Sequence, residues 1–296
     1  MIERQNPVGP IGYLEPEAFR SSPRLVPLHT PRQAAVSPSM RRSSFQHDGL
    51  RLSYLDAGGD GPVLVALHAH WMEAATYRPL AAALHPAWRV VALDQRGHGH
   101  SDHASGDDGY TRDAYIGDVF ALFAHLGVES AVLLGNSLGG VNAYQFAARY
   151  PERVRGLVIE DVGAQFVTDV SFVLAWTGVF SSPEALAERV GPRLAPYLAD
   201  SFRRTPEGWR LAFDPRDMLA SQRHLDGDHW ADWLASSCPA LLVHGRDSRV
   251  TGGEMMEEMA RRRANATLEV LDGGHVVHVD DPVGFSNAVR AFLESL

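Results

Sequence analysis

The feature that most constrains the fold is the pentapeptide Gly-Asn-Ser-Leu-Gly at residues 135–139. An apolar run precedes it at residues 131–134, and a segment with a helical pattern follows it at residues 141–149. A strand, a very tight turn and a helix in this order need small residues beside the turn residue, because the strand and the helix approach closely. The pattern predicts that Ser137 is held in strained backbone geometry, with its hydroxyl above the sheet edge. By itself, the motif also fits a glycine-rich turn with a structural serine.

Strand-like and helix-like segments alternate along most of the chain. Two strands around Asp48-Gly49 predict a hairpin. Short continuous apolar runs are typical of strands buried on both faces of a parallel sheet, and they occur at residues 63–67, 89–93, 131–134, 157–160, 240–244 and 267–271. Helical segments are expected at residues 74–84, 113–126, 141–149, 253–263 and 282–296. This alternation predicts an α/β fold with a mostly parallel sheet and helices on both of its faces.

The alternation is interrupted once. Residues 162–238 are rich in large aromatic residues and prolines and predict a helical cap inserted into a single domain. The α/β core is then expected to comprise residues 42–161 and 239–296. Residues 1–41 contain many prolines and no sustained periodicity, which predicts an extension outside the core.

Composition narrows the class of protein. A chain of 296 residues with 45% hydrophobic and 21% charged residues is typical of a globular protein with a sizeable core. The net charge of −9 argues against nucleic acid or an anionic membrane as a partner, since both require a basic surface. No long apolar segment or export signal is evident. The single cysteine, Cys238, excludes an internal disulfide. A cytoplasmic protein is therefore expected, and its oligomeric state is left open.

Polar residues at other strand ends provide partners for Ser137. A serine hydroxyl is a weak nucleophile at neutral pH, so it requires a nearby base and a group that orients this base. Asp247 follows the predicted strand at residues 240–244, and His275 follows the strand at residues 267–271. Because parallel strands end at the same sheet edge, these side chains are expected to gather there. Two alternatives stay open: Asp161 as the acid, since it ends another strand, and His278 as the base.

These motifs together resemble the α/β-hydrolase fold superfamily, in particular serine hydrolases of the carboxylesterase type with a helical cap. The resemblance extends from about Phe45 to the C-terminus. Four blocks carry it: Gly-Asn-Ser-Leu-Gly-Gly at residues 135–140, Asp-Gln-Arg-Gly-His-Gly-His-Ser at residues 94–101, Gly-Arg-Asp at residues 245–247 and Gly-His-Val-Val-His-Val-Asp at residues 274–280. The blocks are specific for the fold and for a catalytic triad of serine, acid and histidine, but they say little about the substrate.

The resemblance implies a role for each residue of the site. Ser137 is the expected nucleophile, His275 the base, and Asp247 the carboxylate that orients the imidazole. The oxyanion hole is expected to consist of the backbone N–H groups of Leu138 and His70.

The loop after residues 63–67 departs from the family pattern, because Ala69 replaces the usual glycine of His-Gly-x. Trp71 beside this loop and Trp230 near the end of the cap are candidate substrate contacts. The histidines could suggest a metal site, but their loop positions and the lack of accompanying Cys or Glu disfavour it. These are His68, His70, His98, His100 and His103. Neither a metal nor a cofactor is expected.

The resulting functional hypothesis is a cofactor-free serine hydrolase acting on a small apolar carboxylic ester or lactone. Three alternatives remain: a carbon–carbon bond hydrolase of the meta-cleavage type, a cofactor-free perhydrolase and a hydrolase-derived ligand receptor. The turn between the predicted strand and helix at Ser137, which we call the elbow, reads Gly-Asn-Ser, and this sequence is frequent in carbon–carbon bond hydrolases. Residues 68–71, however, lack the glycine-rich oxyanion segment of that class. The complete Ser, Asp and His set argues against a receptor. Haloalkane dehalogenases and epoxide hydrolases are disfavoured, because their nucleophile is an aspartate.

Overall fold

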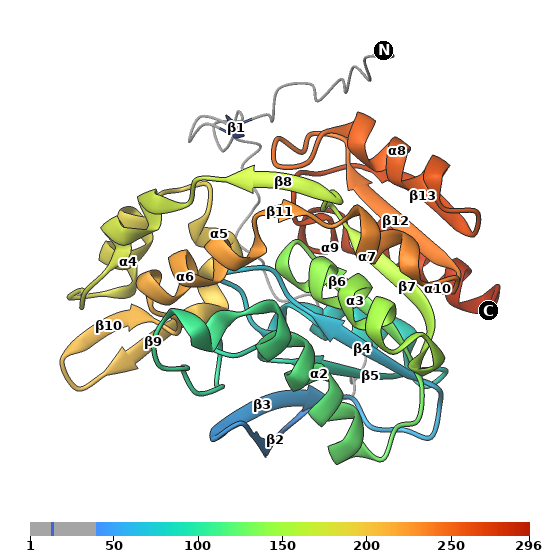
Figure 1. Ribbon diagram of the computed structural model, residues 1–296. Coiled ribbons are helices and arrows are strands. Elements are labelled where there is room, and N and C mark those ends of the chain that lie inside the picture. Colours follow the sequence, from blue (N-terminus) through green and yellow to red (C-terminus); the bar gives the residue numbers. More distant parts are fainter. Residues whose placement is uncertain (1–12, 15–39) are drawn as a thin grey trace, which may run out of the picture.

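An eight-stranded, mostly parallel sheet forms the centre of the molecule (Figure 1). The structure is a computed structural model that describes residues 13–14 and 40–296. The strand order is β13-β12-β7-β6-β4-β5-β3-β2, and the hairpin β2–β3 joins β5 in antiparallel orientation. The strands are β2 (Arg41–His47), β3 (Leu50–Asp56), β4 (Val63–Leu67), β5 (Arg89–Leu93), β6 (Ala131–Asn136), β7 (Val154–Glu160), β12 (Ala240–Gly245) and β13 (Ala266–Leu271). The predicted fold class is confirmed.

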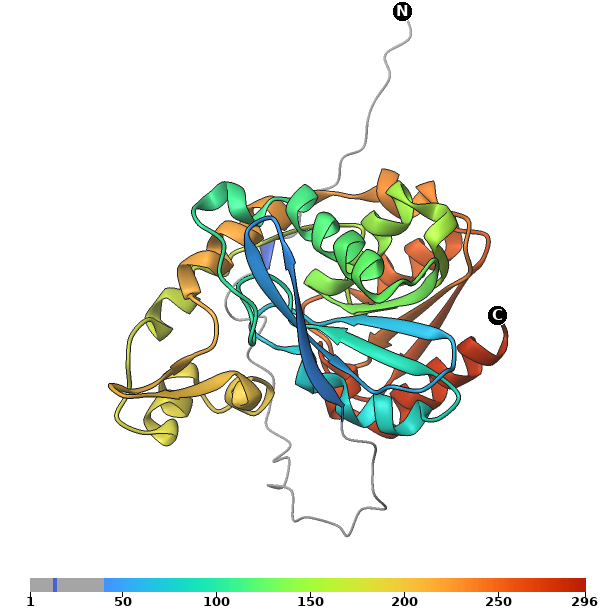
Figure 2. The same cartoon turned by 90° about the horizontal axis from the view of Figure 1, so that it is seen from below.

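Helices cover both faces of this sheet (Figure 2). They are α1 (Arg78–Leu84), α2 (Arg112–Leu126), α3 (Leu138–Arg149), α8 (Gly253–Arg262), the single turn α9 (Val277–Asp280) and α10 (Pro282–Glu294). Successive strand residues point to opposite faces. Val65 and Leu67 therefore pack with α2, α3 and α8, whereas Leu64 and Ala66 pack with α1 and α10. This two-sided burial explains why the central strands are continuously apolar in sequence.

Local sequence rules account for several boundaries. The β2–β3 turn places Asp48 at φ 50° and Gly49 at φ 75°, the left-handed geometry of a tight hairpin turn. Helix α2 begins after Thr111, whose side chain accepts a hydrogen bond from the N–H of Ala114, and ends at Gly127 with φ 64°. Short 3-10 helices connect other elements: η2 (Ala74–Tyr77), η3 (Asp107–Tyr110) and η4 (Pro151–Arg153).

The chain between β7 and β12 forms an added layer: much of it lies beyond the end of the sheet, at the left of Figure 1, whereas its last helix, at residues 230–235, packs against α3. It contains β8 (Gln165–Thr168), η5 (Ser171–Trp176), α4 (Pro183–Val190), α5 (Ala195–Leu198), η6 (Ala199–Ser201), β9 (Phe202–Thr205), β10 (Gly208–Leu211), α6 (Pro215–Leu225), β11 (Gly227–Asp228) and α7 (Trp230–Ala235). We call this layer the cap. It differs from the all-helical expectation, because β9 and β10 form a hairpin and β8 pairs with β11. Gly208, at φ 142°, supplies a backbone conformation that the hairpin requires.

The predicted extension at residues 1–41 lies largely outside the described residues. Within it, β1 (Tyr13–Leu14) pairs in parallel with β8, and Arg41 already belongs to β2. In the part of the chain that is described, no helix has both the length and the apolar character needed to cross a membrane.

Candidate active site

The candidate site lies where the strand order changes direction. β5 adds to one side of β4, whereas β6 adds to the other, so the loops that follow β4 and β6 diverge. In an open α/β sheet, this divergence leaves a crevice at the carboxyl ends of the strands. The loop after β4 contains the predicted oxyanion segment, and Ser137 follows β6 directly.

Ser137 occupies a strained turn between β6 and α3. Its backbone angles, φ 53° and ψ −117°, are unusual for a residue with a side chain. A Cβ at Gly135 would collide with the carbonyl of Gly139, and a Cβ at Gly139 would collide with the carbonyl of Leu67. The close approach predicted from the two glycines is therefore confirmed, and it brings the elbow against the end of β4.

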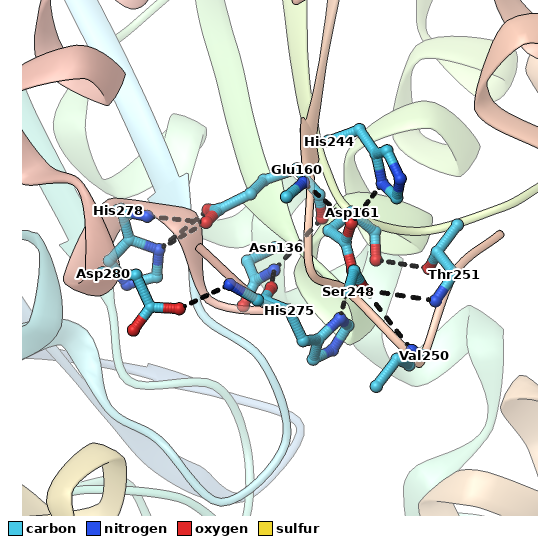
Figure 3. Close-up of polar contacts among 12 residues, drawn as sticks. Asn136, Glu160, Asp161, His244, Ser248, Val250, Thr251, His275, His278 and Asp280 are labelled. Atoms are coloured by element: carbon cyan, nitrogen blue, oxygen red, sulfur yellow. Dashed lines mark hydrogen bonds and ion pairs between the residues drawn. The ribbon is translucent and has the colours of Figure 1, made fainter. Parts of the chain in front are cut away.

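His275 and Asp161 form a close hydrogen-bonded pair (Figure 3). The Nδ1 of His275 lies 2.7 Å from Oδ2 of Asp161, so the imidazole donates to the carboxylate. Asp161 follows β7, is fully buried and has φ 50°. Its side chain is thereby turned from the strand end toward His275, which is partly exposed. A buried carboxylate on Nδ1 holds the imidazole in the tautomer that leaves Nε2 available as a base.

The structure places Asp161, and not the predicted Asp247, against His275. Asp247 is exposed, and its backbone N–H donates to the carbonyl of Gly273. In the same turn the N–H of Ser248 bonds back to Gly245. These bonds direct the side chain of Asp247 to solvent, while the hydroxyl of Ser248 donates to Oδ2 of Asp161 at 2.6 Å. The alternative acid, Asp161, is the carboxylate that contacts His275.

Asp161 accepts further hydrogen bonds on its other oxygen. The Nδ1 of His244 lies 2.7 Å from Oδ1, and the N–H of Gly245 lies 3.3 Å from the same atom. Burial would raise the pKa of Asp161, but the hydrogen bonds from His244 and His275 outweigh it, and the pKa is lowered. His244 and Ser248 were missed in the sequence, although both flank the strand end that drew attention to Asp247.

The loop that carries His275 is anchored on three sides (Figure 3). The Nδ2 of Asn136 donates to the carbonyl of His275 at 3.0 Å, which ties this loop to the residue before Ser137. The N–H of His278 donates to Oε1 of Glu160 at 2.9 Å. The ring of His278 also bonds the carboxylate of Glu160 through Nδ1 and the hydroxyl of Thr76 through Nε2. With both ring nitrogens occupied in the core, His278 serves as an anchor.

The predicted oxyanion loop is held rigidly from behind. The ring of His68 accepts a hydrogen bond from the N–H of Gln95 at 3.0 Å, and the amide of Gln95 donates to the carbonyl of His68. Ala69 does not have a positive φ, whereas Trp71 does, at 70°. Alanine therefore fits this loop without the conformational freedom of glycine. The Nε2 of His70 shares a hydrogen bond with the hydroxyl of Ser221 on α6 at 2.8 Å.

The histidines around this loop are buried and neutral. Burial lowers the pKa of His68 to about 4 and that of His70 to about 3, and it also lowers the pKa of His98. Among the described residues, no group of three His, Cys, Asp or Glu side chains is arranged to hold a metal ion.

The two predicted substrate contacts lie in different surroundings. Trp71 packs edge-on against Phe172 and Trp176, within the apolar cluster of the cap. Trp230, at the start of α7, lies 3.8 Å below the guanidinium of Arg262. Most of the other aromatic side chains of the cap lie, like Trp71, in this apolar cluster.

The sequence and the fold of the chain are similar to those of known proteins. The model of the alpha/beta hydrolase family matches residues 63–288. An sn-1-specific diacylglycerol lipase of Mus musculus is 30% identical, with 89% of this chain and 94% of that protein covered. A 2-(acetamidomethylene)succinate hydrolase of Mesorhizobium japonicum is 27% identical, covering 80% and 90%. A crystal structure of E-2-(acetamidomethylene)succinate hydrolase superimposes with a TM-score of 0.76 at 25% identity, covering 86% of this chain and 99% of that one.

A 2-hydroxymuconate semialdehyde hydrolase of a Pseudomonas species is 28% identical, covering 85% and 90%. These three relatives are named as hydrolases or a lipase of different substrates. Because the family model spans most of the sequence and agrees with the observed sheet, the chain belongs to the alpha/beta hydrolase family.

Proposed function

We propose that this hydrolase cleaves a small carboxylic ester or lactone through an acyl-enzyme on Ser137. The observation that carries the proposal is the hydrogen bond from His275 to the buried carboxylate of Asp161, in a loop tethered to the elbow by Asn136. A strained serine, an oriented imidazole and a buried acid are the three parts that nucleophilic acyl transfer requires.

The reaction proceeds in two halves. Oγ of Ser137 attacks the acyl carbon while Nε2 of His275 takes the hydroxyl proton. Asp161 stabilises the imidazolium. The oxyanion accepts hydrogen bonds from the backbone N–H groups of Leu138 and His70. His275 then gives its proton to the leaving alkoxide, and the acyl-enzyme remains. Water attacks it with His275 as base, which releases the acid and restores Ser137.

The start of α3 supports this assignment of Leu138. Leu138 is the first residue of the helix, and the first N–H groups of a helix have no intrahelical partner. They also lie at the positive end of the helix dipole. The closeness of Gly139 to Leu67 brings the loop after β4 alongside this helix start. The two proposed N–H donors are thus carried by adjoining segments.

The test is turnover of a series of 4-nitrophenyl esters with increasing acyl length. We expect hydrolysis by the wild-type protein and loss of it in Ser137→Ala, with Ser105→Ala, in an exposed loop, as the matched control. Unreduced turnover in Ser137→Ala would overturn the proposal. The series also identifies the acyl length that the site accepts.

Carbon–carbon bond hydrolysis is a second candidate, supported by the related 2-hydroxymuconate semialdehyde hydrolase. The same assay on a vinylogous 1,5-diketone separates the two reactions. Ester hydrolysis as the main activity predicts no cleavage of the diketone at enzyme concentrations that hydrolyse the esters. Faster cleavage of the diketone than of every ester would favour the second candidate.

A further inference from the structure

Arg112 places a positive charge at the boundary between the core and the cap. It is the first residue of α2, and its guanidinium reaches across to α3. Nε donates to Oε1 of Gln145 at 2.9 Å, and Nη2 donates to Oδ1 of Asn142. The third nitrogen, Nη1, is enclosed by protein and has no hydrogen-bond partner.

The charge of Arg112 is not balanced by a bonded carboxylate. Both of its hydrogen-bond acceptors are neutral amides, and the ion pairs among the described residues do not include it. Arg96, whose side chain is more deeply buried than that of Arg112, shows how a buried guanidinium is usually neutralised: it binds both oxygens of Asp118 at 2.7 and 2.8 Å. Burial lowers the pKa of Arg112 to about 10, so the side chain is still cationic at neutral pH. The carboxylate of Asp232 acts on this charge from a distance and is joined to Arg112 only through Gln145. A largely buried cation with no directly bonded anion is costly, and an anion that binds it removes part of this cost.

The guanidinium is also linked to the candidate site through a chain of side-chain contacts. It sits 5.3 Å from the ring centre of Tyr115, whose hydroxyl hydrogen-bonds Ser221, the residue that holds the ring of His70. The pKa of His70 is lowered chiefly by burial, and the charge of Arg112 is the next-largest cause. The field of Arg112 therefore reaches the residue that we propose as an oxyanion donor.

A second chain of hydrogen bonds leads to the same loop. Asn142, which accepts from Arg112, donates to the side chain of Gln95, and Gln95 in turn holds His68. On the cap side, Gln145 donates to Asp232 at 2.8 Å and contacts His229. Arg112 thus lies between α2, α3 and the cap, and it is joined to the loop after β4 by neutral groups alone.

We propose that Arg112 binds an anionic group of the substrate, namely a carboxylate remote from the bond that is cleaved. The free Nη1 supplies the hydrogen bond, and the unbalanced charge selects an ionised group over a neutral one. The substrate class is then an ester or lactone that carries a second, free carboxylate. This inference rests on the proposed function of Ser137 and narrows it, since a wholly apolar ester would leave Arg112 unpaired.

The experiment compares two esters that differ in one charge. Mono-4-nitrophenyl glutarate carries the carboxylate, and its methyl ester lacks it. We expect the wild-type protein to have the higher kcat/KM on the acid. Arg112→Gln is expected to lose about ten- to a hundredfold on the acid and little on the methyl ester, as for the loss of one charged hydrogen bond. The matched control is Arg149→Gln, an exposed arginine on α3 that pairs with Asp113.

The outcomes separate this inference from the proposed function. The ratio of kcat/KM on the acid to kcat/KM on the methyl ester could be equal in Arg112→Gln and the wild type, and this would overturn the role of Arg112. Such a result is expected if Arg112 only connects α2 to α3 or binds water. Failure of the proposed function would instead appear as unreduced hydrolysis of both esters by Ser137→Ala. If Arg112→Gln does not fold, the test uses the wild-type protein with glutarate, which carries carboxylates, and with glutaramide, its neutral diamide. We then expect glutarate to raise the melting temperature more than glutaramide does. Equal shifts would contradict the inference.

Discussion

At the scale of single residues, the direction of the backbone decides which carboxylate meets His275. Asp161 and Asp247 both follow strands that end at the same sheet edge. Asp161 adopts φ 50° and turns its side chain inward, whereas the turn at Asp247 is closed by backbone hydrogen bonds that leave this side chain in solvent. A sequence motif records residue type and spacing, so it cannot record this difference in φ.

The first prediction concerns these two carboxylates. Asp161→Asn replaces the acceptor by a group that no longer stabilises the imidazolium or selects its tautomer, and we expect kcat on nitrophenyl esters to fall by about 10⁴-fold. Asp247→Asn changes an exposed side chain, and we expect kcat to stay within about twofold of the wild type. Steady-state kinetics of both variants provide the measurement. A larger loss in Asp247→Asn than in Asp161→Asn would show that Asp247 is the acid.

The other site residues were predictable to different degrees. The strained turn at Ser137 could be inferred because two glycines and the flanking pattern impose its geometry. His275 could be inferred because it follows a strand at the correct edge. The anchoring roles of Asn136 and His278 depend on contacts with residues far away in the chain, for which the sequence gives no signal.

At the scale of elements, a contact between a buried carboxyl group and a partly exposed arginine ties the cap to the loop after β4. Glu73 lies just before η2, and its carboxylate accepts a hydrogen bond from Arg203 on β9. Nearby, the hydroxyl of Ser201 donates to the carbonyl of Trp71 at 2.8 Å. Glu73 is 4% exposed, and burial raises its pKa to about 7 despite the charge of Arg203.

The second prediction follows from this raised pKa. The ordinary pKa of the unfolded chain is 4.5, so between about pH 4.5 and 7 the folded protein holds a proton that the unfolded chain has lost. This contribution to stability is complete below pH 4.5 and is lost as the pH rises through 7. Glu73→Gln removes the titration, so its free energy of unfolding should fall less between pH 5 and 8 than that of the wild type.

Urea unfolding at both pH values provides the measurement, with Glu188→Gln on the exposed side of α4 as the control. The control is expected to show the same pH dependence as the wild type. An unchanged pH dependence in Glu73→Gln would show that Glu73 is already ionised at pH 5 in the folded protein.

The elements of the core were predictable, and those of the cap were less so. Strands such as β4 and β5 are buried on both faces, which imposes an apolar run with clear ends. The strands β9 and β10 are short, polar in part and only half-buried. Their stability comes from pairing with each other and from the cap cluster, and such contacts leave little periodicity in the sequence.

At the scale of the whole molecule, the order of the strands assembles the site. The elbow and the proposed oxyanion loop follow β6 and β4, where the sheet reverses its order, while Asp161 and His275 follow β7 and β13. Four segments that are distant in sequence thereby meet at one edge. The cap, inserted between β7 and β12, supplies Ser221 and Arg203, which contact His70 and Glu73 in the loop after β4.

The central claim is that Ser137 is the nucleophile of this assembly, and covalent labelling tests it most directly. The wild-type protein is treated with a fluorophosphonate, and the adduct is located by peptide mass spectrometry. We predict one adduct, on the peptide that contains Ser137, and no adduct on that site in Ser137→Ala. An adduct on another residue, or labelling of Ser137→Ala at the wild-type rate, would contradict the claim.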